Sequence, residues 1–415
     1  VRRGRTYVIE NVEPAFESPT NRTIFAFRHR TRNDPMLLYR VITTEVSRHL
    51  KYKRHVSGRI HPVFLYGRGV PVWGGPLVAW LVPRIGGISV YQGQVNRASY
   101  QLVQEELRNG NDPIALAPEG QVVYHNERVS LTQRGTAMLA LDAAQYGPVS
   151  IVPVGIRYDY PDPSPGRVRK FLMPVINELG VAVSPTAPSV EIVTACATAV
   201  LDDLEATYTD RYPRVVARIK EEASLPPTAF GEASLERGDT GLKRLTRQAA
   251  EIREVALRAL EAAYGLTAAG DVLTRLYRAR HQLYRMMFPL PPEKTVRSRI
   301  GRWKHMLYDL HAVEAHVLAR HMEVADLLSY VDFSYIDGEP HPNRIAEYAM
   351  QVADLFNRAV GKTIGQRSAW SNREAAIRFG EAIEVRRETT GRADKKDVDS
   401  LSNRVESALV DLSQL

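Results

Sequence analysis

The pattern of apolar and polar positions changes near residue 210. Before that point, short apolar runs bounded by glycine, proline or polar residues alternate with longer amphipathic stretches. The short runs predict strands at 23–28, 87–91, 113–118 and 150–156. The amphipathic stretches predict helices at 36–50, 99–110, 132–147 and 189–208. Strands that alternate with helices are typical of an α/β domain with a largely buried sheet, so we expect such a domain over residues 1–210.

Beyond residue 241 the pattern is helical. Apolar residues recur every three or four positions between Leu242 and Ala263, which marks one apolar face of a helix. Similar periodicity predicts helices at 271–287, 296–328 and 343–360, and the highly charged tail from residue 372 predicts a solvated helix. Proline and glycine punctuate the stretch before residue 242. We therefore expect a linker at 211–241 and an all-α C-terminal domain at 242–415.

Pro153 interrupts the predicted strand at 150–156. Proline cannot donate a hydrogen bond to a neighbouring strand, so it is rare in the middle of a sheet. We therefore expect this strand to lie at an edge of the sheet or to contain a bulge.

Composition narrows the class of protein. The length of 415 residues suits two domains, and the hydrophobic share of 44% with 25% charged residues is typical of soluble globular proteins. The single cysteine, Cys196, excludes an intrachain disulfide and a cysteine metal site, and it suits a reducing cytoplasm. No run reaches the roughly 18 apolar residues that would span a bilayer. We expect a cytoplasmic location, with any membrane contact limited to the surface.

The net charge of +8 favours an anionic partner, which could be a nucleic acid, a membrane surface or a phosphorylated substrate. The basic residues after residue 240 are interspersed with glutamate, which indicates a salt-bridged surface and not a nucleic-acid site. Histidine and glutamate also gather on one predicted helix, but a bundle metal site would need paired motifs on two helices. We expect that helix to be solvated and to hold no metal; the residues are His311, Glu314, His316 and His321.

The stretch FRHRTRNDP at 27–35 carries the first candidate chemistry. His29 follows a predicted strand, and Asp34 lies five residues further on. A carboxylate at that spacing can fold back onto the imidazole ring, fix its tautomer and stabilise its charged form. The second ring nitrogen could then take a proton from a substrate hydroxyl. The alternative interpretation is that Asp34 only caps the helix that Pro35 begins, and that His29 is an exposed loop residue.

Further polar residues are expected at the same edge of the sheet. Glu119 and Gly120 follow the predicted strand 113–118, where a carboxylate can hold a polar substrate and a glycine lets the backbone approach closely. Ligands of α/β domains usually bind at the carboxyl ends of the strands. Cations that could hold a phosphate flank His29 in the sequence, namely Arg28, Arg30 and Arg32.

Four sequence blocks occur in one order along the chain: His29 to Asp34, Gly86 to Gln92, Pro118 to Gly120, and Val149 to Val154. This combination resembles the glycerolipid acyltransferases, most closely the 1-acylglycerol-3-phosphate acyltransferases of bacteria, over about residues 20–208. The resemblance implies a mixed sheet flanked by helices. It also implies transfer of a fatty acyl group from acyl-CoA or acyl-carrier protein to the hydroxyl of a lysophosphatidic acid, giving phosphatidic acid. It implies no cofactor beyond the acyl thioester co-substrate.

The resemblance assigns roles to individual residues. His29 would be the general base, Asp34 its orienting partner, and Glu119 with Gly120 would bind the acceptor, without an acyl-enzyme. In the family the second block usually ends in an arginine that binds the acceptor phosphate, whereas this chain has Gln92. Other cations could replace it. The expected substrate-binding residues are therefore Glu119, Gly120, Arg28, Arg30, Arg32, Gln92 and Arg97, with Arg84 as a further candidate.

Three alternatives stay open. The acceptor could be glycerol 3-phosphate or another lysolipid, because Gln92 departs from the family pattern. The domain could be an inactive acyltransferase-like module that binds a membrane or a protein. The apolar run from Pro62 to Val82, with Trp73 and Trp80, could hold the acyl chain, contact lipid or form ordinary core.

Overall fold

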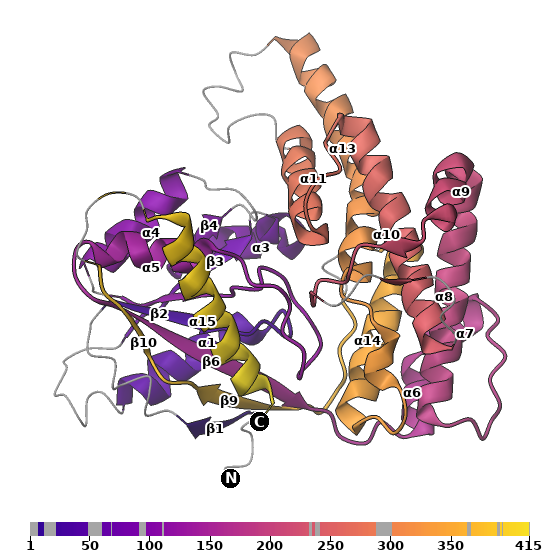
Figure 1. Cartoon of the computed structure of the whole chain (residues 1–415), viewed down its shortest axis with the longest axis horizontal. Helices are drawn as coiled ribbons and strands as arrows, with labels where there is room; N and C mark the ends of the chain where they lie inside the picture. The colour runs from indigo at the N-terminus through magenta and orange to yellow at the C-terminus, as the bar shows by residue number, and fades with distance from the viewer. Residues whose placement is uncertain are drawn as a thin grey trace. The chain divides into compact units, whose positions relative to one another are not determined.

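The computed structural model divides the chain into two compact units (Figure 1). Unit 1 comprises Val1–Pro161 and Trp370–Leu415, and unit 2 comprises Asp162–Ala369. The chain therefore leaves unit 1, builds unit 2 and returns. The structure describes residues 7–11, 22–48, 60–67, 69–90, 97–109, 112–231, 235–236, 241–287, 301–362, 367–387, 391 and 393–414, of which 71–73 and 235–236 are described by backbone alone.

Unit 1 is built on an eight-stranded, mostly parallel sheet with the order β1-β9-β6-β2-β5-β3-β4, in which β10 also pairs with β6. Strands β6, β2, β5, β3 and β4 run parallel, and β9 and β10 run antiparallel to β6. The predicted α/β class with a mixed sheet is therefore confirmed. The strands are β1 Tyr7–Asn11, β2 Thr23–Phe27, β3 Val63–Gly67, β4 Ile88–Val90, β5 Ile114–Leu116, β6 Val149–Asp159, β9 Glu374–Phe379 and β10 Ile383–Val385.

Strand β6 is central in the sheet, so the prediction of an edge strand is wrong. On one side it pairs with β2 along Ser150–Val154. On the other side β10 pairs with residues 149–151 and β9 with residues 154–159. Pro153 lies at the gap between these two partners, where its missing N–H leaves no ladder bond unmade.

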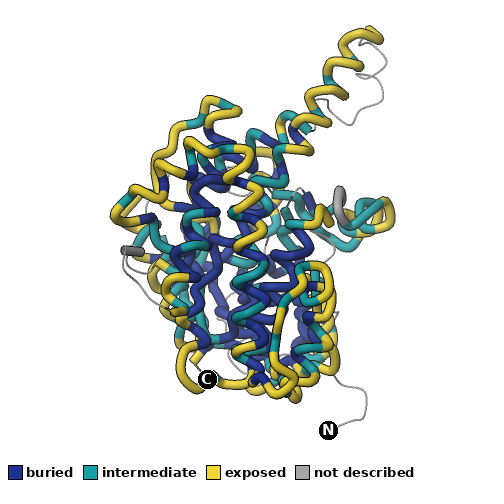
Figure 2. The backbone as a smooth tube through the Cα atoms, turned by 90° about the vertical axis from the view of Figure 1, so that its right-hand side faces the viewer, coloured by how far each residue is buried: buried dark blue, intermediate teal, exposed yellow. Residues whose placement is uncertain are grey.

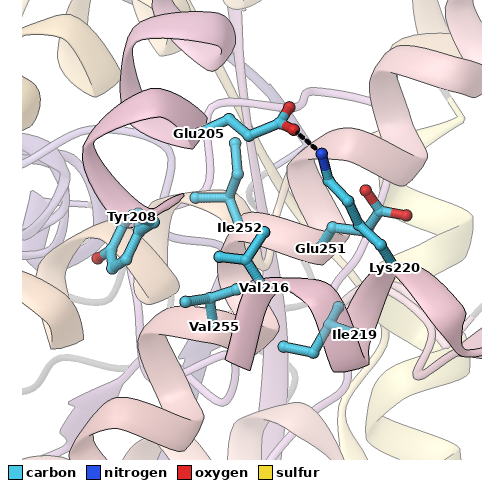
Figure 3. A pocket seen from close by; sticks show the side chains of 8 residues that line it. All are labelled: Glu205, Tyr208, Val216, Ile219, Lys220, Glu251, Ile252 and Val255. Carbon is cyan, nitrogen blue, oxygen red and sulfur yellow. Dashed lines mark hydrogen bonds and ion pairs between the residues drawn. The ribbon is translucent and has the colours of Figure 1, made fainter. Parts of the chain in front are cut away.

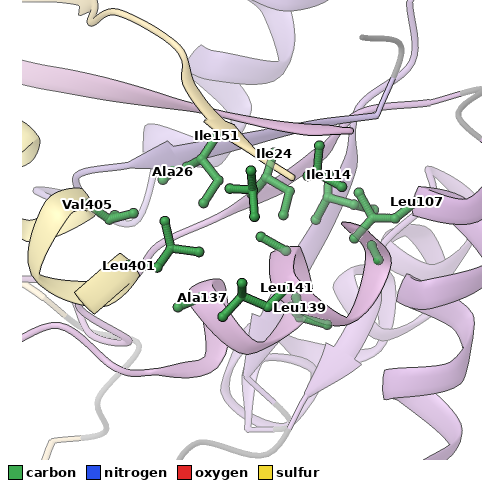
Figure 4. Packing of buried hydrophobic residues seen from close by; sticks show 14 of the residues in the cluster. Ile24, Ala26, Leu107, Ile114, Ala137, Leu139, Leu141, Ile151, Leu401 and Val405 are labelled. Carbon is green, nitrogen blue, oxygen red and sulfur yellow. The ribbon is translucent and has the colours of Figure 1, made fainter. Parts of the chain in front are cut away.

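Helices cover the sheet of unit 1 and share one apolar core with it (Figure 4). Ile24, Ile114 and Ile151 from the strands pack with Leu107 of α4, with leucines of α5, and with Leu401, Val405 and Leu409 of α15. The C-terminal helix therefore belongs to the core of this unit. The helices are α1 Asp34–Val41, which continues as the π-helix Ile42–Val46, α3 Val70–Arg84, α4 Arg97–Asn109, α5 Gly135–Ala144 and α15 Lys395–Ser413.

Unit 2 is a helical bundle. α13 packs against α10, α11 and α14, and α8 packs against α10 and α14. Buried residues run along the contacting sides of these helices, dark blue in Figure 2. No helix in the described parts of the chain is long and apolar enough to cross a membrane. The elements are α6 Pro165–Phe171, α7 Met173–Glu178, α8 Ser189–Arg211, α9 Pro213–Glu221, β7 Ser224–Leu225, β8 Leu235–Glu236, α10 Leu242–Tyr264, α11 Val272–Met287, α13 Arg302–Leu328, η3 Phe333–Ile336 and α14 Pro342–Ala359.

The division into units differs from the predicted domain boundaries. Residues 162–210, placed in the first domain by the sequence pattern, form helices of unit 2, and part of the predicted linker 211–241 forms α9. The all-α prediction for 242–415 is wrong for residues 374–385, because β9 and β10 join the sheet of unit 1. The tail does form a helix, α15, but it belongs to unit 1 and not to a C-terminal domain. In β9, buried and more exposed residues alternate, which is the strand period that the charged tail concealed.

We expect Leu409→Ala to lower the free energy of unfolding of unit 1 by about 2–5 kcal/mol, because it empties a fully buried site between α15 and the sheet. Denaturant unfolding measures the loss. Leu102→Ala is the matched control, since Leu102 is 52% exposed on α4 and should change stability by less than about 0.5 kcal/mol. If Leu409→Ala changed the free energy of unfolding as little as Leu102→Ala does, α15 would be a solvated tail.

Candidate active site

The carboxyl ends of two neighbouring strands bring His29 and Glu119 together. β2 and β5 pair in parallel, with Ala26 opposite Leu116, and each ends within a residue of that pair. His29 and Glu119 follow a few residues later, at the same edge of the sheet. The backbone N–H of His29 donates a hydrogen bond to Glu119 Oε2 at 3.4 Å. The structure therefore brings these two residues together at one edge of the sheet, as the sequence predicted.

His29 and Asp34 form the expected pair. His29 Nδ1 lies 3.2 Å from Asp34 Oδ2, and the Asp34 side chain is fully buried while that of His29 is 19% exposed. The turn between them closes through the N–H of Asp34, which donates to the carbonyl of Thr31 at 3.0 Å. The exposed member of the pair is therefore the imidazole, as a general base that meets a substrate requires.

Asp34 is not the N-cap of α1, so that expectation is wrong. Asn33 occupies the N-cap position, and the Asp34 carboxylate turns toward the preceding residues. Its Oδ2 accepts hydrogen bonds from the N–H groups of Arg30 and Thr31, the latter at 2.6 Å. The carboxylate therefore organises the turn that carries His29 and leaves the first turn of the helix uncapped by a side chain.

Tyr158 and Thr31 hold the other oxygen of Asp34. The Tyr158 hydroxyl donates to Oδ1 at 2.6 Å and the Thr31 hydroxyl donates to the same oxygen at 2.8 Å. Burial, followed by the Asp34 charge, raises the pKa of Tyr158 far above its ordinary value, so the phenol stays a donor. Because Oδ1 is held, Oδ2 stays directed at His29. Arg373 lies over the Tyr158 ring, with its guanidinium carbon 4.7 Å from the centroid.

Sequence reasoning missed Tyr158 and Arg373. The predicted strand ended at residue 156, whereas β6 continues to Asp159. Arg373 immediately precedes β9, which was predicted as part of a solvated tail. Buried and more exposed positions alternate in β9 and over the last residues of β6, Ile156–Asp159, whereas the rest of β6 is buried throughout. That alternation was the signal that could have placed the two residues.

The buried side chain of Glu119 connects the turn of His29 to Ser130 and Arg28. Its Oε1 accepts from the N–H and the hydroxyl of Ser130, at 3.1 and 3.3 Å, and lies 3.5 Å from Arg28 Nη2. The side chain is fully buried. Burial raises the pKa of Glu119, against the opposing charge of Arg30 and the hydrogen bonds from Ser130 and His29. The carboxylate thus positions the His29 backbone, and the expectation that it touches the acceptor directly does not fit its enclosure by protein groups.

Gly120 allows the tight turn after β5. Its φ angle of +68° lies in the left-handed region that favours glycine. Its N–H donates to the carbonyl of Ala117 at 3.0 Å, which closes the turn that carries Glu119. The role that the structure shows for Gly120 is therefore conformational.

Arg28 and Arg30 point into the protein, so their prediction as phosphate ligands is wrong. Both side chains are buried. Arg28 donates to the carbonyls of Asn126, at 3.0 Å, and of Arg128. Arg30 donates to the carbonyls of Val123 and Asn126, each at 3.2 Å. The two guanidinium groups fix the loop after Glu119.

The other residues predicted to bind the substrate lie in different parts of unit 1 or outside the described residues. Arg32 is exposed in the turn between His29 and Asp34. Arg97 is exposed at the first residue of α4, and Arg84 stacks over Trp80 with its guanidinium carbon 4.4 Å from the ring centroid. Gln92 lies outside the described residues. Among the residues that the structure describes, Arg32 is the exposed one of the two expected cations in the turn between His29 and Asp34.

The histidine-rich helix holds no converging ligand set. His311 and Glu314 are exposed and 3.7 Å apart. His321 is not solvated as expected: its ring nitrogens lie 3.0 and 3.1 Å from the hydroxyls of Tyr208 and Tyr212, and burial lowers its pKa to about 4. Across the described chain, no group of three histidine, cysteine, aspartate or glutamate side chains could hold a metal ion.

A small pocket in unit 2 lies between α8, α9 and α10 (Figure 3). Apolar residues form most of its wall, and Lys220 donates to Glu205 at its polar side. Neither member of the His29–Asp34 pair lines it, so it adds nothing to the candidate chemistry. Its lining residues are Glu205, Tyr208, Val216, Ile219, Lys220, Glu251, Ile252 and Val255.

In comparisons with known proteins, no family model matches this chain, and no curated protein or solved structure matches it either. What points to a function for this chain is therefore the geometry around His29 and the resemblance of the four sequence blocks.

We expect Tyr158→Phe to reduce the share of the His29 tautomer that carries its proton on Nδ1, because Asp34 Oδ1 loses a donor and the carboxylate can rotate away. ¹⁵N NMR of labelled histidine measures the tautomers without any substrate. The free energy of unfolding should fall by about 1–3 kcal/mol. Tyr160→Phe is the control. It also removes one phenolic hydroxyl from the same strand end, and its ring centroid lies 6.3 Å from that of Tyr158. An unchanged tautomer in a folded Tyr158→Phe protein would contradict this role.

We expect Glu119→Gln to gain stability relative to the wild type as pH rises. The folded-state pKa of Glu119 is raised, so the stability that its protonated form contributes is fully present below about pH 4.5 and is lost as pH rises through the folded value. Glutamine resembles the protonated carboxyl at every pH. Urea unfolding of both proteins between about pH 4 and 8 measures the difference. If the difference in free energy of unfolding between the two proteins stayed constant, or favoured the wild type more as pH rose, the raised pKa would be contradicted.

Proposed function

We propose that unit 1 is an acyltransferase. It moves a fatty acyl group from an acyl thioester to the hydroxyl of a lysophosphatidic acid, giving phosphatidic acid for phospholipid synthesis. The observation that carries the proposal is the pairing of His29 with the buried carboxylate of Asp34 at the carboxyl ends of parallel strands. The likeness of the four sequence blocks to glycerolipid acyltransferases supports the same reaction class.

The chemistry follows from the two ring nitrogens of His29. Asp34 accepts a hydrogen bond from the Nδ1–H group, so Nε2 carries the lone pair and takes the proton of the acceptor hydroxyl. The hydroxyl oxygen attacks the thioester carbonyl, the carbon–sulfur bond breaks, and the imidazolium returns the proton to the leaving thiolate. No protein nucleophile takes part. Cys196 is buried in unit 2, where burial raises the pKa of its thiol to about 11.

Arg32 is the residue that we assign to the acceptor phosphate. It is exposed in the same turn as His29, whereas Arg28 and Arg30 are directed at the loop after Glu119. Gln92, in place of the family's usual arginine, favours a second candidate within the same reaction class, in which the acceptor is glycerol 3-phosphate or another lysolipid.

Helix α3 fits a site of lipid contact. It carries exposed apolar side chains at Leu77, Trp80 and Leu81, and the Arg84 guanidinium stacks on Trp80. A tryptophan and an arginine beside an apolar face are typical of proteins at a membrane surface. We place the enzyme on the cytoplasmic face of the membrane, where acyl thioesters and lysolipids meet. The side chain of Trp73 lies outside the described residues.

The test is transfer of a palmitoyl group from palmitoyl-CoA and from palmitoyl-carrier protein to lysophosphatidic acid, glycerol 3-phosphate and other lysolipids. We expect the wild type to form product and His29→Ala to lose about 10²–10⁴-fold in rate, because the general base is gone. His311→Ala is the control, since His311 is an exposed histidine of unit 2. Absence of product from the wild type with every donor and acceptor would contradict the proposal, as would an unimpaired His29→Ala variant.

A further inference from the structure

The first half of α13 carries an apolar stripe that faces solvent. Six large side chains recur along one face at helical spacing, with exposed fractions from 50% at Leu307 to 74% at Trp303. The described residues of these turns are exposed on nearly every side, yellow in Figure 2. Soluble monomers rarely expose a contiguous apolar surface of this kind unless it binds something. The stripe consists of Trp303, Met306, Leu307, Leu310, Val313 and Val317.

The second half of the same helix is packed into unit 2. Ala315, Ala319 and Met322 are buried there, and α13 packs against α10, α11 and α14 of its own unit. The stripe therefore does not belong to the core of the bundle. It is an additional apolar face on a helix that is already held in place.

The charges along the helix indicate what the stripe meets. Arg302 and Lys304 are exposed beside Trp303 at the start of the helix, whereas Asp309 and Glu314 come one to three turns later. A tryptophan between two cations at the end of an apolar face suits the boundary between anionic headgroups and acyl chains. The chain as a whole is also positive, with a net charge of +8. Because the acidic residues lie further along, the first turns are the part that suits insertion.

From Trp303 to Val317 the stripe is about 21 Å long and about 10 Å wide. A lipid surface needs no matching protein area, because the side chains enter an apolar layer directly.

We propose that the stripe on α13 is a membrane-binding site that inserts its first turns into an anionic lipid surface. The contact lies in unit 2 and is separate from the contact assigned to α3 in unit 1. It adds a lipid anchor to the acyl transfer proposed above, but vesicle binding is measured without turnover. Either proposal can therefore fail alone.

The experiment is co-sedimentation of the full-length chain with vesicles that contain about 30 mol % phosphatidylglycerol in phosphatidylcholine. We expect the double variant Leu307→Glu/Leu310→Glu to lower the vesicle partition coefficient at least about tenfold, because it places charge in the apolar face. Leu102→Glu is the matched control, since Leu102 is 52% exposed on α4, and it should bind like the wild type. The substituted leucines are exposed, so circular dichroism should show that all variants stay folded.

A second readout places the stripe directly. Cys196 is buried, so a cysteine introduced by Met306→Cys in a Cys196→Ala background can carry an environment-sensitive fluorophore alone. We expect its emission to shift to the blue on addition of these vesicles. Equal partition of the wild type and the double variant, or an unshifted label, would overturn the proposal. So would a dimer that the double variant loses while neither protein binds vesicles, which would assign the stripe to a second copy.

Discussion

The carboxylate of Asp34 is the group on which the candidate site depends. It is fully buried and accepts from five donors: His29 Nδ1, the N–H groups of Arg30 and Thr31, and the hydroxyls of Thr31 and Tyr158. A buried charge is tolerated only when it is paired and hydrogen-bonded. The requirement to satisfy this one carboxylate therefore fixes the turn after β2, the end of β6 and the orientation of the imidazole together.

The C-terminal helix α15 also supports the candidate site, through contacts with the segment 127–132. Thr132 donates to Glu406 of α15 through both its N–H and its hydroxyl, at 3.1 and 2.7 Å. Ser413 donates to the carbonyl of Glu127 at 3.1 Å. These contacts hold the segment that carries Ser130, which in turn binds Glu119. The last residues of the chain thus complete a site whose first residue, His29, lies more than 350 positions earlier.

Features that follow from local spacing or from the pairing of parallel strands could be predicted from the sequence, and other long-range features could not. The His29–Asp34 pair needs only a spacing of five residues, and the meeting of His29 with Glu119 follows from parallel strands. The directions of Arg28 and Arg30 depend on a loop about a hundred residues away, so their charge was mistaken for a phosphate site. Strands β9 and β6 pair although all of unit 2 lies between them in the sequence, and local periodicity contains no information about such a partner.

In the proposed reaction, His29 activates a hydroxyl that belongs to the substrate, and not one that belongs to the protein. The measurement that separates these two cases is thiol release from palmitoyl-CoA by the wild-type chain, with and without acceptor. We expect thiol to appear only when a lysolipid or glycerol 3-phosphate is present, in equal amount to the acylated product. A burst of thiol release without acceptor, or covalently acylated protein on mass spectrometry, would show an acyl-enzyme and would overturn the proposed role of His29.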